Sequence, residues 1–209
     1  YPINLTIDKR SIKIKGDSQS NRSTIVSRFV PANPNLPIIQ VGDNNSSILY
    51  HGFRMENCTL LGITGNITGE IGIYLAGGTY ESFLKNIAVN GFRTGISIIG
   101  GSNVPTSVIS IKDSVFASAN IDNSRTIYSR YPINGQASGS YTTDIKFNSC
   151  HINGPQNNGY GIESDGVSLI FNDTYLDCYE NHGVLITKTI SYGSNPTFIC
   201  NNFAIDDSV

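Results

Sequence analysis

Two carboxylates separated by one residue are the clearest candidates for chemistry in this sequence. Glu163 and Asp165 occur in the run Gly-Ile-Glu-Ser-Asp-Gly. If the preceding Ile162 points into a core, strand alternation directs both carboxylates outward, with Cα atoms about 6.6 Å apart. A pair of carboxylates at such a distance can serve as the acid and base of glycoside hydrolysis. The alternative is that both are solvated groups at a turn.

A second pair of titratable residues follows Glu163 and Asp165 after about twenty positions. Glu180 and His182 stand immediately before Gly183, which repeats the position of Gly161. We therefore expect them near the first pair, with His182 tuning or protonating the carboxylates. A histidine before a corner glycine also suits a plain hydrogen-bonding turn, and that interpretation stays open.

Tyrosine and arginine gather around an irregular segment at about 119–143. These two residue types are enriched where proteins bind ligands through exposed surfaces. We predict that they contact substrate, although packing against a neighbouring subunit would use the same residues. The candidate substrate-binding residues are Arg125, Tyr128, Arg130, Tyr131 and Tyr160.

The elements that position these residues follow from a repeated template. The template recurs along the chain in the order apolar-x-polar-x-x-apolar-x-small, where x is any residue. The copies are centred on Asn57, Asn86, Asp113, Ser149, Asp173 and, more weakly, Asn201. Successive centres lie 29, 27, 36, 24 and 28 residues apart, so each copy is one supersecondary unit with loops of variable length.

A glycine followed by aliphatic alternation recurs beside the template. It stands at Gly72-Ile73, Gly95-Ile96, Gly161-Ile162 and Gly183-Val184. Each unit therefore carries at least two short strands, and low charge with abundant glycine suits strands joined by tight corners.

These repeats, together with the alternating opening from Ile3 to Gly16, resemble the right-handed parallel β-helix of the pectin-lyase-like and phage-tailspike superfamily. The resemblance implies an all-β chain folded as a single-stranded right-handed solenoid of about seven to eight coils. It implies one domain over 1–209, a fragment of a longer chain, with a loop insertion at about 119–143. Of the polygalacturonase-like catalytic motifs, only His182-Gly183 has a counterpart in its proper order.

Composition limits the partners. A net charge of −2 and a pI near 5.9 argue against nucleic acid, and no apolar run is long enough to span a membrane. No C-x-x-C spacing occurs, so a zinc site is not expected, and we predict neither a cofactor nor another metal. Cys150, Cys178 and Cys200 lie about one coil apart, so we interpret the cysteines as stacked, buried free thiols, with disulfides as the alternative.

The function that this resemblance favours is a tailspike-like β-helix that binds a bacterial surface polysaccharide, capsule or lipopolysaccharide. Whether it also depolymerises that polysaccharide, as a hydrolase or a lyase, is left open. A homotrimer on a virion tail or at a cell surface is implied. The alternatives are a non-catalytic adhesin or spacer and a secreted polysaccharide lyase.

Overall fold

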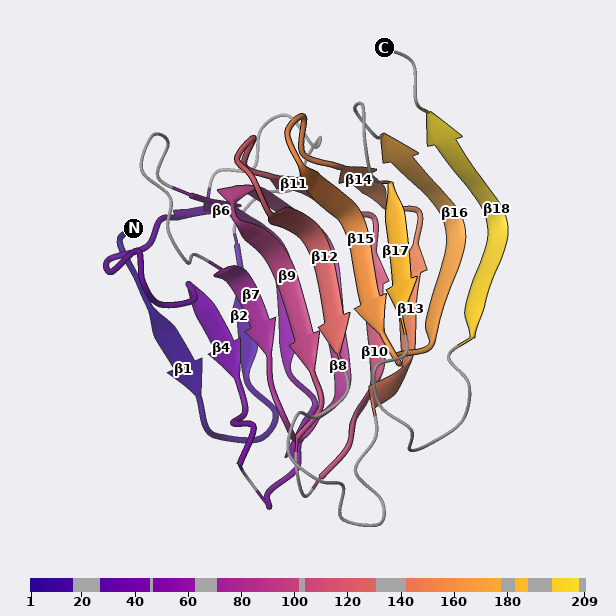
Figure 1. The fold of residues 1–209 in the computed structure, drawn as a ribbon. Helices are drawn as coiled ribbons and strands as arrows, with labels where there is room; N and C mark the ends of the chain where they lie inside the picture. Colours follow the sequence, from indigo (N-terminus) through magenta and orange to yellow (C-terminus); the bar gives the residue numbers. More distant parts are fainter. Residues whose placement is uncertain are drawn as a thin grey trace.

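The computed structural model describes residues 1–16, 27–45, 47–62, 71–101, 104–130, 142–177, 183–187 and 197–206. All regular structure in these ranges is β-strand. The strands form a seven-stranded sheet 1 and an eleven-stranded sheet 2, which lie as two layers with sheet 1 in front in Figure 1. The prediction of an all-β chain with parallel sheets is confirmed.

Sheet 1 contains β1 (Leu5–Ile7), β4 (Ile39–Val41), β7 (Ile71–Leu75), β9 (Thr94–Ile99), β12 (Ser124–Arg130), β15 (Gly159–Asp165) and β17 (Val184–Thr187). Sheet 2 contains β2 (Lys13–Lys15), β3 (Arg28–Phe29), β5 (Tyr50–His51), β6 (Arg54–Leu61), β8 (Thr79–Phe92), β10 (Thr106–Lys112), β11 (Val115–Ser118), β13 (Thr142–Asn148), β14 (His151–Asn153), β16 (Leu169–Asp177) and β18 (Phe198–Asp206).

The chain visits the two sheets in alternation, and we call each passage through sheet 1 and then sheet 2 a rung. The strands from β1 to β16 each pair in parallel with the equivalent strand of the next rung, as β7 does with β9 and β9 with β12. Figure 1 shows this order as a colour gradient that runs across both sheets from β1 to β18. Side chains at equivalent positions therefore stack in columns along the molecule.

The polar centre of the template is a sharp corner within sheet 2. Because Glu56 pairs with Lys85 and Cys58 with Ile87, Asn57 lies beside Asn86. The register continues this column through every later rung, and all of its members have left-handed backbone, with φ between 46° and 56°. The column consists of Asn57, Asn86, Asp113, Ser149, Asp173 and Asn202.

Asparagine and aspartate suit this corner because their short polar side chains tolerate left-handed backbone and bond locally. The Asn86 amide donates to Oδ1 of Asn57 at 2.8 Å, and the Asn202 amide donates to Oδ1 of Asp173 at 2.7 Å. In the last rung the corner residue is thus Asn202, and the template centre expected at Asn201 is wrong by one position. Asn201 instead lies beside Asn172, one residue before the corner. It belongs to the flat stretch of sheet 2 that precedes the corner, which we call the flat wall.

The core lies between the sheets and is built from stacked apolar columns. In sheet 1 one column runs through Ile73, Ile96, Ile127 and Ile162, all fully buried. In sheet 2 the rings of Phe147 and Phe171 stack with centroids 5.0 Å apart. Such aromatic pairs add stability beyond their buried area.

The strand β12 lies inside the segment at about 119–143 that the sequence assigned to a loop insertion. Ser124–Arg130 pairs with both β9 and β15, so this part of the segment is a regular rung strand. It lacks the glycine that stands at the start of β7, β9, β15 and β17, because Thr126 takes that place. The Thr126 hydroxyl bonds Ser118 Oγ and the Asn153 carbonyl at 3.0 and 2.6 Å, which explains how a larger residue is accommodated.

The cysteines only partly follow the prediction of stacked, buried thiols. Cys58 and Cys150 are buried thiols, and burial raises the pKa of the Cys58 thiol to about 11. Cys200 is free but exposed, because it lies on β18, beyond which the described residues provide no further strand of sheet 2. It pairs with Phe171 and so does not share a column with Cys150. Cys178 lies outside the described residues.

A second left-handed corner, not visible in the sequence, separates the flat wall of sheet 2 from the preceding turn. Its column contains Ser11, Gly52, Glu81, Val108 and Asp144. Val108 has φ of 56° and is 39% exposed. A β-branched side chain is strained in this backbone conformation, since its Cβ approaches the carbonyl oxygen that follows.

We predict that Val108→Asn raises the free energy of unfolding by about 1 kcal/mol, because asparagine tolerates left-handed backbone better than valine. Urea denaturation of the two proteins measures the difference. Ser110→Asn, on the same strand but outside the corner column, is the control and should give no gain. Equal or lower stability of Val108→Asn would show that the corner is not strained.

Candidate functional site

The outer face of sheet 1 carries most of the predicted site on the adjacent strands β12 and β15. Their inner face is marked by Ser129, whose hydroxyl donates to Ser164 Oγ at 3.0 Å in the interior. Residues on either side of these serines therefore point outward. The register places three pairs side by side: Arg125 with Tyr160, Tyr128 with Glu163, and Arg130 with Asp165.

Arg125 links the first two of these pairs. Its Nε–H donates to Oε2 of Glu163, and its guanidinium carbon lies 4.8 Å from the centroid of the Tyr128 ring. The Glu163 side chain is only 17% exposed, which strengthens the ion pair relative to one in open solvent. Arg125 is thus held by a carboxylate and an aromatic face at once.

Arg130 and Asp165 form a looser ion pair. Arg130 Nε lies 3.7 Å from Asp165 Oδ2, too far for a direct hydrogen bond. Nε of Arg130 is buried and has no hydrogen-bond partner among the described residues. The Asp165 side chain is 9% exposed, whereas the sequence suggested a freely exposed carboxylate.

The column that contains Tyr128 and Glu163 extends toward the N-terminal rungs through Ser97 and Tyr74. Ser97 is 1% exposed although it faces outward, since it lies between the two larger tyrosines. The Tyr74 hydroxyl accepts a hydrogen bond from the Asn44 amide at 2.5 Å. Burial raises the pKa of Tyr74, and the bond from Asn44 opposes that rise, so the phenol stays neutral at physiological pH.

Six of the nine predicted site residues therefore come together on two neighbouring strands. They are Arg125, Tyr128, Arg130, Tyr160, Glu163 and Asp165. The other three, Tyr131, Glu180 and His182, lie outside the described residues. Sequence reasoning did not find Asn44 or Ser97. The strand register places Ser97 beside Tyr74, and a hydrogen bond places Asn44 there.

Each carboxylate of the expected catalytic pair faces an arginine. Glu163 is hydrogen-bonded to Arg125, and Asp165 lies 3.7 Å from Arg130. The two carboxylates therefore do not face each other across a space in which a glycosidic bond could lie. The described residues contain no group of three or more His, Cys, Asp or Glu that could hold a metal ion. They also form no helix of the length and apolarity needed to cross a membrane. The cluster offers aromatic faces, guanidinium groups and carboxylate oxygens on rigid strands.

No family model, curated protein or solved structure matches this chain.

We predict that Arg125 and Glu163 stabilise the fold as a coupled pair. A double-mutant cycle with Arg125→Gln and Glu163→Gln should give a coupling free energy of about 1 kcal/mol, because the pair is partly buried. Urea denaturation of the four proteins measures it. The same cycle on Lys13 and Glu56, a more exposed pair, should give a smaller coupling. Independent effects at Arg125 and Glu163 would contradict the bonded geometry.

Proposed function

We propose that this chain is a right-handed parallel β-helix that binds a bacterial surface polysaccharide through the outer face of sheet 1. The right hand is supported by a general rule for parallel strands. When a strand, a crossover and a second parallel strand lie in one sheet, the connection is right-handed in nearly all proteins, because the strand twist favours that path. Between each pair of successive sheet 1 strands, from β1 to β17, the chain makes such a crossover through sheet 2.

The arrangement of Arg125, Tyr128 and Glu163 carries the proposal. A tyrosine ring presents an apolar face to the C–H surface of a sugar, while guanidinium and carboxylate groups bond its hydroxyls. These three side chains are fixed by an ion pair and a cation–π contact on regular strands, so little conformational entropy is lost on binding. Tyr74 adds a second ring to the same column, two rungs away.

Binding is favoured over bond cleavage because both carboxylates are occupied by arginines. Hydrolysis requires one carboxyl group to protonate the leaving oxygen and a second to act on the opposite side of the sugar. In this structure Glu163 and Asp165 each compensate a guanidinium charge instead. A non-catalytic receptor-binding role thus fits the geometry better than depolymerisation.

We predict that Tyr128→Ala weakens binding of the recognised polysaccharide about tenfold, as expected for loss of an aromatic anchor. Biolayer interferometry on immobilised capsule and lipopolysaccharide preparations gives the dissociation constant. Tyr1→Ala is the control, because Tyr1 is 81% exposed and belongs to another part of the fold. If Tyr128→Ala bound the polysaccharide with wild-type affinity, the outer face of sheet 1 would not be the binding face.

The same preparations distinguish a binding protein from an enzyme. Incubation with the wild-type chain should release neither reducing ends nor unsaturated uronates. If either product appears, Glu163→Ala and Asp165→Ala show whether these carboxylates cause the release. The homotrimer and the virion or cell-surface location stay predictions from the family resemblance, and sedimentation velocity on the isolated chain tests the first.

A further inference from the structure

A strip of basic side chains covers the flat wall of sheet 2 between its two left-handed corners. We call it the basic strip, and it consists of Lys13, Lys15, Arg54, Lys85, Lys112 and Lys146. The sequence has 14 lysines and arginines in all and a net charge of −2, so this wall departs sharply from the average of the chain. One acid, Glu56, faces outward among them.

The register brings these cations side by side. Lys85 and Lys112 are Cα partners on β8 and β10, and Lys13 and Arg54 are partners on β2 and β6. Neighbouring strands lie about 4.8 Å apart, so the charged groups repeat at that interval along the molecule. Like charges directly opposite one another destabilise a sheet, and salt only partly screens such close pairs.

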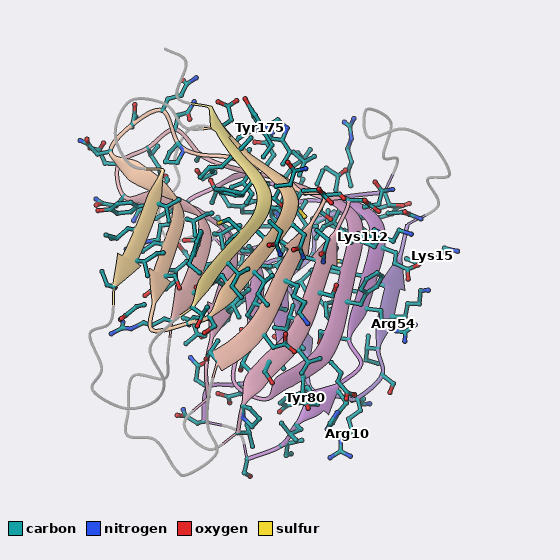
Figure 2. The ribbon with its side chains drawn as sticks, turned by 90° about the vertical axis from the view of Figure 1, so that its right-hand side faces the viewer. Arg10, Lys15, Arg54, Tyr80, Lys112 and Tyr175 are labelled. Carbon is teal, nitrogen blue, oxygen red and sulfur yellow. The ribbon has the colours of Figure 1, made fainter. Side chains whose placement is uncertain are left out.

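Most of the strip is not neutralised within the described part of the chain. Lys13 pairs with Glu56 at 3.0 Å, and Lys146 pairs with Asp144 at 2.8 Å. Across the described ranges, Lys15, Arg54, Lys85 and Lys112 form no ion pair, and all four are exposed. Figure 2 shows Lys15, Arg54 and Lys112 on the same side of the molecule, with Arg10 below them.

Acids at the flanking corners do not cancel this charge. Glu81 faces His51, with Oε2 to Nδ1 at 3.6 Å, and Asp173 accepts a hydrogen bond from Asn202. Asp113 follows Lys112 at the corner itself and forms no ion pair with another described residue. The wall therefore keeps an excess of positive charge that a ligand with regularly spaced negative groups would offset.

The wall continues beyond the cations as a ladder of amides. Asn172 donates to Oδ1 of Asn148 at 2.7 Å, and Asn201 donates to Oδ1 of Asn172 at 2.8 Å, in the same column as Lys85 and Lys112. These amides are fixed in position and keep further hydrogen-bonding capacity for hydroxyl groups. Carboxylate-binding and hydroxyl-binding groups thus follow one another along a single line.

We propose that the basic strip binds an acidic polysaccharide whose sugars carry carboxylates, with the polysaccharide lying along the stack of rungs. The inference rests on the proposed function in taking a polysaccharide as the ligand, but it concerns the opposite sheet. The strand interval of about 4.8 Å is close to the length of one sugar in an extended 1,4-linked chain. Duplex DNA carries a far denser charge, which this wall and the negative chain as a whole match poorly.

The test compares binding of a polyuronate with binding of the same polymer after its carboxyl groups are reduced to alcohols. The variant Lys85→Gln with Lys112→Gln removes the directly opposed pair. Its affinity for the polyuronate should fall about five- to tenfold, and its melting temperature should stay equal or rise, because a repulsion is relieved. The control Lys9→Gln with Arg28→Gln removes the same charge elsewhere and should bind as the wild type does.

Three results would overturn the inference. They are equal wild-type affinity for the reduced polymer, wild-type affinity of the Lys85 and Lys112 variant for the polyuronate, and tighter binding of duplex DNA or anionic vesicles than of the polyuronate. Tyr128→Ala separates the two proposals. If only Tyr128→Ala loses binding, sheet 1 is the binding face and the proposal for the basic strip is wrong. If only the variant of Lys85 and Lys112 loses binding, the basic strip is the binding face and the proposal for sheet 1 is wrong.

Discussion

In-register parallel pairing between rungs is the constraint on which the rest of this structure depends. Because Ile73, Ile96, Ile127 and Ile162 stack on one another, their outward neighbours also form columns. The left-handed corner that begins at Asn57 fixes where each wall ends, so the columns stay straight from rung to rung. Both proposed binding faces are consequences of this regularity, since each combines strands that are far apart in sequence.

The parts of the fold that the sequence could predict are those where one residue type is required by the backbone. Asn57, Asn86, Asp113 and Asp173 recur because left-handed backbone favours short polar side chains, and the spacing of these residues revealed the repeat. The strand glycines recur for a steric reason: a Cβ at Gly95 would lie 2.7 Å from the carbonyl oxygen of Thr126. Where Thr126 replaces the glycine, the signal disappears, and β12 was mistaken for a loop.

The remaining features depend on pairings that no local pattern encodes. The second corner contains serine, glycine, glutamate, valine and aspartate, which share no side-chain property. Arg125 and Glu163 are 38 residues apart, and the sequence predicted a substrate contact for Arg125 and an outward carboxylate for Glu163, not that they neutralise each other. The basic strip was hidden by the negative net charge, because its lysines and its arginine come from five different rungs.

The most direct test of the account is whether predicted column neighbours can be joined covalently. Lys85 and Lys112 are Cα partners, at a strand separation that a disulfide can span. The variant Lys85→Cys with Lys112→Cys should form an intramolecular disulfide under mild oxidation, seen as a loss of two hydrogens in the intact mass. Lys85→Cys with Lys146→Cys, in different columns two strands apart, should stay reduced. A disulfide in the second variant and none in the first would contradict the stacking register and both binding faces built on it.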